Sequence, residues 1–213
     1  MLDAILFTKP PILLRSVYRK CLWSVHTTEK SLFLTFDDGP IPEVTPFVLD
    51  QLKKYNALAT FFCIGRNIEE NPEIFERIIN EGHSIGNHSY DHLNGWQTDN
   101  ETYYKNIEAC GETLKKQYPQ FSSPLFRPPY GKLKPAQYKF LKDRYKIVLW
   151  DVLSFDFEPK LNEEKVLQNV LDNAGPGSVI VFHDSLKARL KVEYALPKVL
   201  EHFSAKGFKF EKL

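Results

Sequence analysis

The sequence contains little cysteine and no excess of charge of either sign. Only three of its 213 residues are cysteine, and Cys21, Cys63 and Cys110 lie far apart without a CxxC pair. An odd number of isolated cysteines argues against a disulfide framework and a thiolate zinc site, and predicts a reducing compartment. The 28 lysine and arginine residues against 27 aspartate and glutamate residues give a formal net charge of +1. We therefore expect no nucleic-acid partner.

Long apolar runs and low-complexity segments are also missing. The most apolar amino-terminal stretch, 2–25, is interrupted by lysine, arginine and proline. It is too interrupted to span a membrane and lacks the basic start and small-residue cleavage site of a signal peptide. We therefore expect a cytoplasmic protein without a membrane span. The composition, 43% hydrophobic and 26% charged, is that of an ordinary folded domain.

Short apolar runs alternate with helical patterns along the chain. The first pair is a buried strand over 31–36 and a helix over 43–55. Further strands are predicted at 59–64, 83–86, 125–127, 145–150, 178–182 and 208–212, and helices at 72–81, 100–117, 134–143, 163–173 and up to about 206. This alternation predicts a parallel sheet with helices outside it, either doubly wound or a barrel. Six or seven such units are fewer than a complete eightfold barrel needs, so a barrel would be shortened and imperfect.

The amino-terminal segment stands apart from this alternation. Residues 12–25 predict a helix that packs across one end or side of the barrel, and its amphipathic face is an alternative oligomer contact. We therefore divide the chain into a helical segment over 1–30, packed on the barrel, and a catalytic domain over 31–213. The oligomeric state is not predicted.

Ionisable residues gather where the predicted strands end. They come from five different units: Asp37, Asp38, His88, His92, Arg127, Asp156, His183 and Asp184. In parallel α/β folds the loops at the carboxyl ends of the strands converge on the active site. The sequence therefore predicts one shared site at this end of the barrel.

Two pairs of residues predict a metal site. The string around Asp37 and Asp38 is by itself typical of a turn, but adjacent carboxylates at a buried strand end repel each other unless a cation is present. One carboxylate can bind a metal while the other accepts a proton. His88 and His92 have the i, i+4 spacing that projects two side chains to one side of a helical turn. A lone pair at this spacing is more often on the surface. With a carboxylate nearby, it predicts a His/His/Asp site for zinc or another divalent transition metal.

Two further strand ends carry candidate catalytic groups. The Arg127–Gly131 string, RPPYG, is either a structural turn or a rigid loop that fixes the Tyr130 N–H as an oxyanion donor. Arg127 is expected to pair with a nearby carboxylate. His183 is either a hydrogen-bonded histidine at a strand end or, beside Asp156, an imidazole held in one tautomer with a raised pKa, as a general acid requires.

Five motifs occur in the order found in the polysaccharide deacetylase family, also called carbohydrate esterase family 4 or the NodB homology domain. They are TFDDGP at 35–40, HSYDH at 88–92, RPPYG at 127–131, a version of DxxDW that ends in Asp156-Phe157, and a version of LxxH at 180–183. The chain resembles this family over about 31–213. The resemblance implies an α/β fold, a distorted and incomplete (β/α) barrel of about seven strands. It also implies removal of an N-acetyl group from an amino sugar with one divalent metal, commonly zinc, with cobalt, nickel or iron as alternatives.

The resemblance also implies a role for each motif residue. The implied metal ligands are Asp38, His88 and His92. The implied catalytic groups are Asp37 as general base, Arg127 that orients it, His183 as general acid, Asp156 that tunes it, and the N–H of Tyr130 at the oxyanion. Phe157 and Ile180 stand where the family usually has Trp and Leu. We expect them, with Tyr130, to contact the substrate in a reshaped pocket for its acetyl methyl group.

The expected substrate is an acetylated amino sugar of the N-acetylglucosamine type, as an oligo- or polysaccharide. Two alternatives keep hydrolysis on the same fold: an O-acetyl esterase and a hydrolase of a non-sugar amide. A third alternative is a carbohydrate-binding protein that has lost catalysis. The complete set of site residues argues against this last alternative.

Overall fold

A computed structural model describes residues 7–213. Its strands are β1 Ser31–Asp37, β2 Ala59–Cys63, β3 Ser84–Asn87, β4 Leu125–Phe126, β5 Lys146–Ile147, β6 Val152–Leu153, β7 Val179–His183 and β8 Lys209–Phe210. Its α-helices are α1 Ile12–Val17, α2 Thr45–Lys54, α3 Gly65–Glu70, α4 Pro72–Asn80, α5 Asn100–Gln117, α6 Pro135–Leu141, α7 Glu163–Leu171 and α8 Arg189–Ala205, with a 3₁₀ turn, η1, at Pro129–Gly131.

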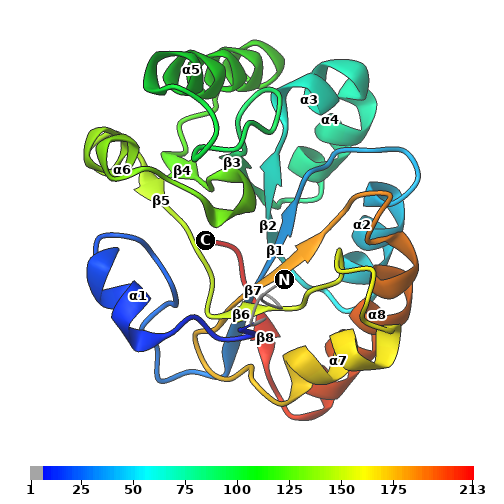
Figure 1. The fold of residues 1–213 in the computed structure, drawn as a ribbon. Helices are drawn as coiled ribbons and strands as arrows, with labels where there is room; N and C mark the ends of the chain where they lie inside the picture. Colours follow the sequence, from blue (N-terminus) through cyan, green and yellow to red (C-terminus); the bar gives the residue numbers. More distant parts are fainter. Residues whose placement is uncertain (1–6) are drawn as a thin grey trace.

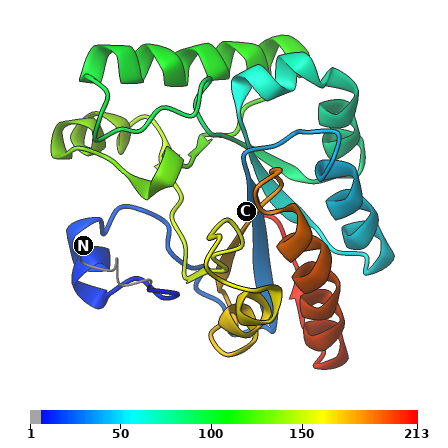
Figure 2. The same ribbon diagram turned by 45° about the vertical axis from the view of Figure 1, so that its right-hand side comes forward.

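The strands form one parallel sheet that curls into an open barrel. Its order is β5-β4-β3-β2-β1-β7-β6, with β8 beside β1, and the helices surround the strands in a ring (Figures 1 and 2). The predicted distorted, incomplete barrel is confirmed. In the central strand β1, Asp37 is in register with His183 of β7. The sheet therefore brings together two candidate catalytic residues from opposite ends of the sequence.

The core lies mainly between the sheet and the helices. Side chains that point outward from the strands, such as Phe36, Phe61 and Phe182, stack there beneath the helices. The three cysteines are free and buried. No helix within residues 7–213 is long and apolar enough to cross a membrane.

The amino-terminal segment differs from the predicted helix over 12–25, which is wrong in extent because α1 ends at Val17. The chain then becomes extended, since its backbone bonds to the barrel. Leu22 donates to the carbonyl of Ile147 and accepts from the N–H of Leu149, both at 2.8 Å, and the N–H of Val25 donates to Gly177. Residues 22–25 thus link the chain that follows edge strand β5 to the residues that precede β7. Residues 1–6 of the predicted segment lie outside the described residues, and the division at residue 30 stays a prediction.

The strand before Asp156 also differs from the prediction. The expected strand over 145–150 pairs with β4 only at Lys146–Ile147, and a separate short strand, β6, then pairs with β7. Between β5 and β6 the chain therefore leaves β4 and moves beside β7, and Asp156 follows β6. Helix α3 and the turn η1 were not predicted, whereas the helix over 100–117 is confirmed.

Because the amino-terminal segment packs closely against the barrel, we expect alanine to destabilise the protein at one glycine of the 175–177 turn but not at the other. Gly177 has φ +80°, and a Cβ there would lie 2.0 Å from the carbonyl oxygen of Val25, whereas Gly175 has open space around it. We expect Gly177→Ala to lower the free energy of unfolding by about 2 kcal/mol or more, through left-handed strain and backbone displacement. Gly175→Ala should leave it nearly unchanged. Urea unfolding of both variants checks this, and equal losses would contradict it.

Candidate active site

The predicted site residues converge at the carboxyl end of the barrel. They border a pocket of about 370 Å³ lined by Asp37, His88, His92, Tyr130 and His183 on its polar side. Asp38 lies directly behind this lining, 3.2 Å from His92. The carboxyl ends of the strands place these side chains together, as the sequence predicts for a parallel sheet.

Three side chains form a cluster suited to a metal ion. Asp38 Oδ1 lies 3.2 Å from His92 Nε2 and 3.8 Å from His88 Nε2, and one ligand atom from each residue lies within 4.8 Å of the others. Asp38 Oδ2 pairs with Lys187 Nζ at 3.1 Å, whereas Oδ1 is buried and has no hydrogen-bond partner among the described residues. A buried carboxylate oxygen without a donor is costly unless a cation neutralises it. The donor set therefore fits a divalent metal.

The second nitrogen of His88 fixes the orientation of its ring. His88 Nδ1 lies 2.8 Å from the carbonyl oxygen of Arg127, which can only accept, so Nδ1 carries the proton. The Nε2 lone pair then points to Asp38 and is free to coordinate. A hydrogen bond of this kind is the usual support of a metal-bound histidine.

The two histidines do not lie on a helical turn, and this part of the sequence interpretation is wrong. Residues 88–92 form an irregular loop in which Ser89 has φ +62° and His92 has φ +57°. The side-chain oxygen of Asn87 accepts from the N–H of Ser89, and that of Asn106 on α5 accepts from the two N–H groups before His92. These bonds hold the two rings with their centroids 5.0 Å apart. The loop, not a helix, brings the two rings together.

Burial and neighbouring charges set the protonation of the cluster. Burial alone would raise the pKa of Asp38, but the imidazoles of His92, His183 and His88 hold it well below its ordinary value. Burial lowers the pKa of His88 to about 4. Near neutral pH the carboxylate is therefore anionic and His88 is neutral, which are the forms that bind a metal.

Asp37 is held from beneath by a fully buried arginine. Arg127 Nη1 donates to Asp37 Oδ1 at 2.7 Å and to Thr35 Oγ1 at 2.8 Å, and Nη2 donates to the carbonyl of Leu149. The expected ion pair of Arg127 with a nearby carboxylate is therefore confirmed. Asp37 Oδ2 lies 4.0 Å from His88 Nε2, at the metal cluster. One oxygen of Asp37 is thus anchored and the other is left for chemistry.

His183, which lines the pocket, forms a tight pair with Asp156. Asp156 accepts from the backbone N–H of His183 at 2.6 Å and lies 2.7 Å from its Nδ1. Burial alone would lower the pKa of His183, but Asp156, with contributions from Asp38 and Asp37, raises it to about 9. His183 is therefore a cation near neutral pH, with Nε2 carrying a proton it can donate.

Tyr130 lines the pocket and belongs to a turn in which its own N–H makes no backbone hydrogen bond to a described residue. It has φ +60°, and the N–H groups of Gly131 and Lys132 donate to the two preceding prolines. Within residues 7–213 we find no acceptor for the N–H of Tyr130. Tyr130 is 55% exposed, and the centroid of its ring lies 4.6 Å from that of His92. The turn thus leaves a fixed donor beside the cluster.

The expected contact of Ile180 with the substrate is wrong. Ile180 is fully buried in the core beneath the helices, because side chains alternate along β7 and His183 shares its face with Val181 instead. The apolar wall of the pocket consists of Trp150, Leu153, Phe155, Phe157 and Val181. Phe157 was predicted, and strict alternation back from His183 would have found Val181. Trp150, Leu153 and Phe155 were missed, as were Lys132 and Lys187, because no motif marks them.

Asp184 holds the loop that carries Asp38 and does not line the pocket. Its carboxyl accepts from the N–H of Gly39 at 3.0 Å and from Thr45 Oγ1 at 2.6 Å. Burial raises the pKa of Asp184 to about 8. A Cβ on Gly39 would lie 1.9 Å from this carboxyl, so glycine is required for the close approach.

The sequence is similar to those of known proteins. The model of the family described as polysaccharide deacetylase matches residues 24–143. A peptidoglycan-N-acetylglucosamine deacetylase of Bacillus cereus is 40% identical over 182 residues, which are 84% of this chain and 66% of that protein. Another protein of the same name and organism is 35% identical over 193 residues, 88% of each chain.

A solved structure shows the same fold over almost the whole chain. It is a peptidoglycan N-acetylglucosamine deacetylase in complex with a naphthyl-substituted N-oxidanyl-benzamide, and it superposes with a TM-score of 0.86 at 35% identity. The match covers 96% of this chain and 95% of the other.

The cluster geometry predicts where a metal binds. Asp38→Asn removes the buried anion, so we expect zinc affinity to fall by about 100-fold or more, measured by competition with a chromogenic chelator. Asp91 belongs to the same motif but pairs with Arg66 and Asn106, away from the cluster. Asp91→Asn should therefore bind zinc like the wild type. Equal affinities for all three proteins would contradict the assignment.

The His183–Asp156 pair predicts a pH dependence in the metal-free protein. The pKa of His183 is raised from the ordinary 6.5 to about 9. The pair therefore stabilises the fold fully below pH 6.5, and this stabilisation is lost as the pH rises through about 9. Asp156→Asn should move the titration of His183, followed by NMR, to lower pH. A midpoint that is the same in variant and wild type would refute this cause.

Proposed function

The chain belongs to the polysaccharide deacetylase family, and from that premise we propose that it is a metal-dependent hydrolase that removes N-acetyl groups from amino sugars. One observation carries the proposal. Around one pocket, a cluster suited to a metal lies beside a carboxylate anchored by Arg127, and a cationic imidazole paired with Asp156 lines the same pocket. The names of the relatives support a substrate of the N-acetylglucosamine type, in an oligo- or polysaccharide.

Asp38, His88 and His92 would hold the metal. A bound divalent cation supplies Lewis-acid activation of water and of the acetyl carbonyl. Two imidazoles and one carboxylate are a nitrogen and oxygen donor set typical of catalytic zinc, so we propose zinc, with cobalt, nickel or iron as alternatives.

Asp37 and His183 would move the protons of the reaction. Asp37, held through Oδ1, accepts a proton from the attacking water at its other oxygen. The N–H of Tyr130 donates to the oxyanion that develops on the carbonyl oxygen. His183 then gives its Nε2 proton to the sugar nitrogen as the C–N bond breaks. The products are acetate and a free amine, and the apolar wall beside Val181 and Phe155 would receive the acetyl methyl group.

The state of His183 favours an amide over an ester as the substrate. An amine leaves only when it is protonated, since the amide anion is a far stronger base than an alkoxide. The raised pKa of His183 keeps this proton available across neutral pH. A general acid that stays protonated at neutral pH is needed more for N-deacetylation than for hydrolysis of an O-acetyl ester.

Acetate release from N-acetylglucosamine oligomers by zinc-loaded protein tests the proposal. We expect turnover by the wild type and a kcat lower by about 100-fold or more in Asp37→Asn and His183→Asn, because each removes one proton transfer. Asp91→Asn is the matched control and should keep wild-type kcat. An O-acetylated sugar is offered in parallel.

Two results would overturn the proposal. Release of acetate only from the O-acetyl ester would assign an esterase. Binding of the oligomers without release by the zinc-loaded wild type would assign a carbohydrate-binding protein.

A further inference from the structure

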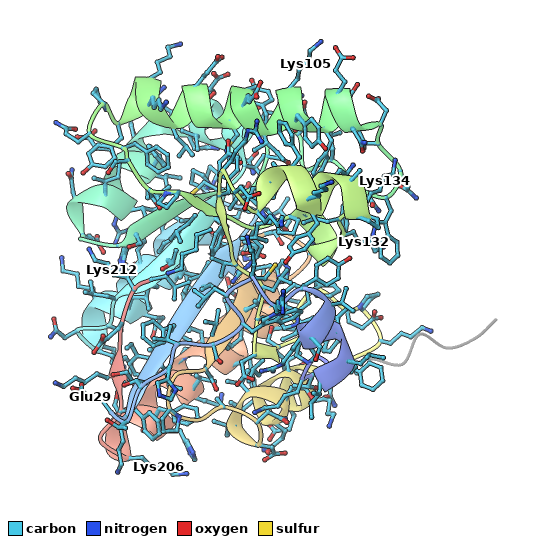
Figure 3. All side chains as sticks on the ribbon, turned by 90° about the vertical axis from the view of Figure 1, so that its left-hand side faces the viewer. Glu29, Lys105, Lys132, Lys134, Lys206 and Lys212 are labelled. Atoms are coloured by element: carbon cyan, nitrogen blue, oxygen red, sulfur yellow. The ribbon has the colours of Figure 1, made fainter. Side chains whose placement is uncertain are left out.

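The large apolar side chains exposed by residues 7–213 gather toward one end of the molecule. Five belong to the first residues described: Phe7, Ile12, Leu13, Leu14 and Val17. The other four follow the carboxyl ends of β3, β4 and β7, where the pocket opens: Trp96, Tyr130, Leu186 and Leu190. Figure 3 shows α1 and Lys132 toward the same end, opposite Glu29 and Lys206. The exposed apolar surface therefore borders the end that carries the catalytic pocket.

Helix α1 is oriented opposite to an ordinary surface helix. None of its residues is buried, and Ile12, Leu13 and Val17 are 84%, 78% and 61% exposed. An amphipathic helix normally turns its apolar side to the core. Here the polar Arg15 faces the barrel and donates to Asp151 at 2.6 Å. The polar contact holds the helix in place and leaves its apolar side outward, as at surfaces that bind a partner.

The charge around this apolar side indicates the chemistry of the partner. Residues 7–28 contain four cationic residues, Lys9, Arg15, Arg19 and Lys20, and no acidic residue. Asp151 pairs with Lys9 and Arg15, and Asp143 pairs with Lys20, so the four cations and these two acidic partners together keep a net positive charge. A second copy of the chain would bring the same positive charge against itself. Anionic lipid headgroups complement it, and exposed Leu, Ile and Val beside Lys and Arg are the composition of segments that lie in a membrane interface.

An apolar cavity beside this segment adjoins the catalytic pocket. It has a volume of about 270 Å³, is lined by Leu14, Tyr18, Trp23 and Trp96, and shares Tyr130, Gly131, Lys132 and Trp150 with the pocket. The surface that carries α1 is therefore continuous with the entrance to the site.

We propose that residues 7–20 bind the surface of an anionic lipid bilayer and hold the catalytic pocket close to it. The segment lies on the membrane and does not cross it. The binding energy comes from Ile12, Leu13 and Val17, and the preference for anionic lipid comes from Arg19 and Lys20. Binding to vesicles that contain no amino sugar can be measured without any deacetylation, so this proposal and the proposed function can fail separately.

Co-sedimentation with phosphatidylglycerol–phosphatidylcholine vesicles tests the proposal. We expect the wild type to bind, to bind less as salt rises, and to bind pure phosphatidylcholine weakly. The triple variant Ile12→Ser/Leu13→Ser/Val17→Ser should lose binding, and Arg19→Glu/Lys20→Glu should weaken it about tenfold or more. The matched control is Lys53→Glu/Lys54→Glu, an adjacent exposed pair on α2, which should bind like the wild type.

Three outcomes would overturn the proposal. The wild type does not sediment with anionic vesicles, or the triple variant binds them as well as the wild type does. In the third, light scattering shows a dimer that the triple variant abolishes, which would assign the apolar face to a second copy. Circular dichroism of each variant, whose changed residues are all exposed, establishes that loss of binding is not loss of fold.

Discussion

The buried ion pair between Arg127 and Asp37 is the interaction on which the site and the barrel interior both depend. Arg127 also donates to Thr35 on the same strand and to the carbonyl of Leu149 beyond β5, and its own carbonyl accepts from His88. A buried cation that loses its partners costs several kcal/mol. The groups that bond to Arg127 are therefore also the groups that align β1, β4 and the cluster of Asp38, His88 and His92.

Backbone strain is concentrated around the same pocket. Among residues 7–213, the non-glycine residues with positive φ are Asp38, Ser89, His92, Tyr130, Phe155 and Asn56, and all but Asn56 belong to the loops of the site. Each such conformation costs free energy that the surrounding structure must supply. The parallel strands supply it. Strands β1, β3 and β4 are hydrogen-bonded on both sides, and β6 is bonded to β7, so the start of each loop is fixed.

The sequence was most informative where a residue's position depends only on the strand that it follows. The ends of buried strands fixed the locations of Asp37 and His183, since parallel strands meet at one edge. It was less informative where loops decide the geometry. The spacing of His88 and His92 suggested a helical turn, although two left-handed residues produce the cluster. Ile180 was misplaced because the motif alone does not tell which face of a strand a residue occupies.

The pairing of β1 with β7 has a consequence for how the protein is made. Asp37 is synthesised early and His183 late, and β8, which also lies on β1, comes last. Contacts between distant parts of a chain form slowly and only after both partners exist. During translation the first strand therefore has one edge unpaired until most of the chain has emerged, and the pairing of Asp37 with His183 is among the last features to assemble.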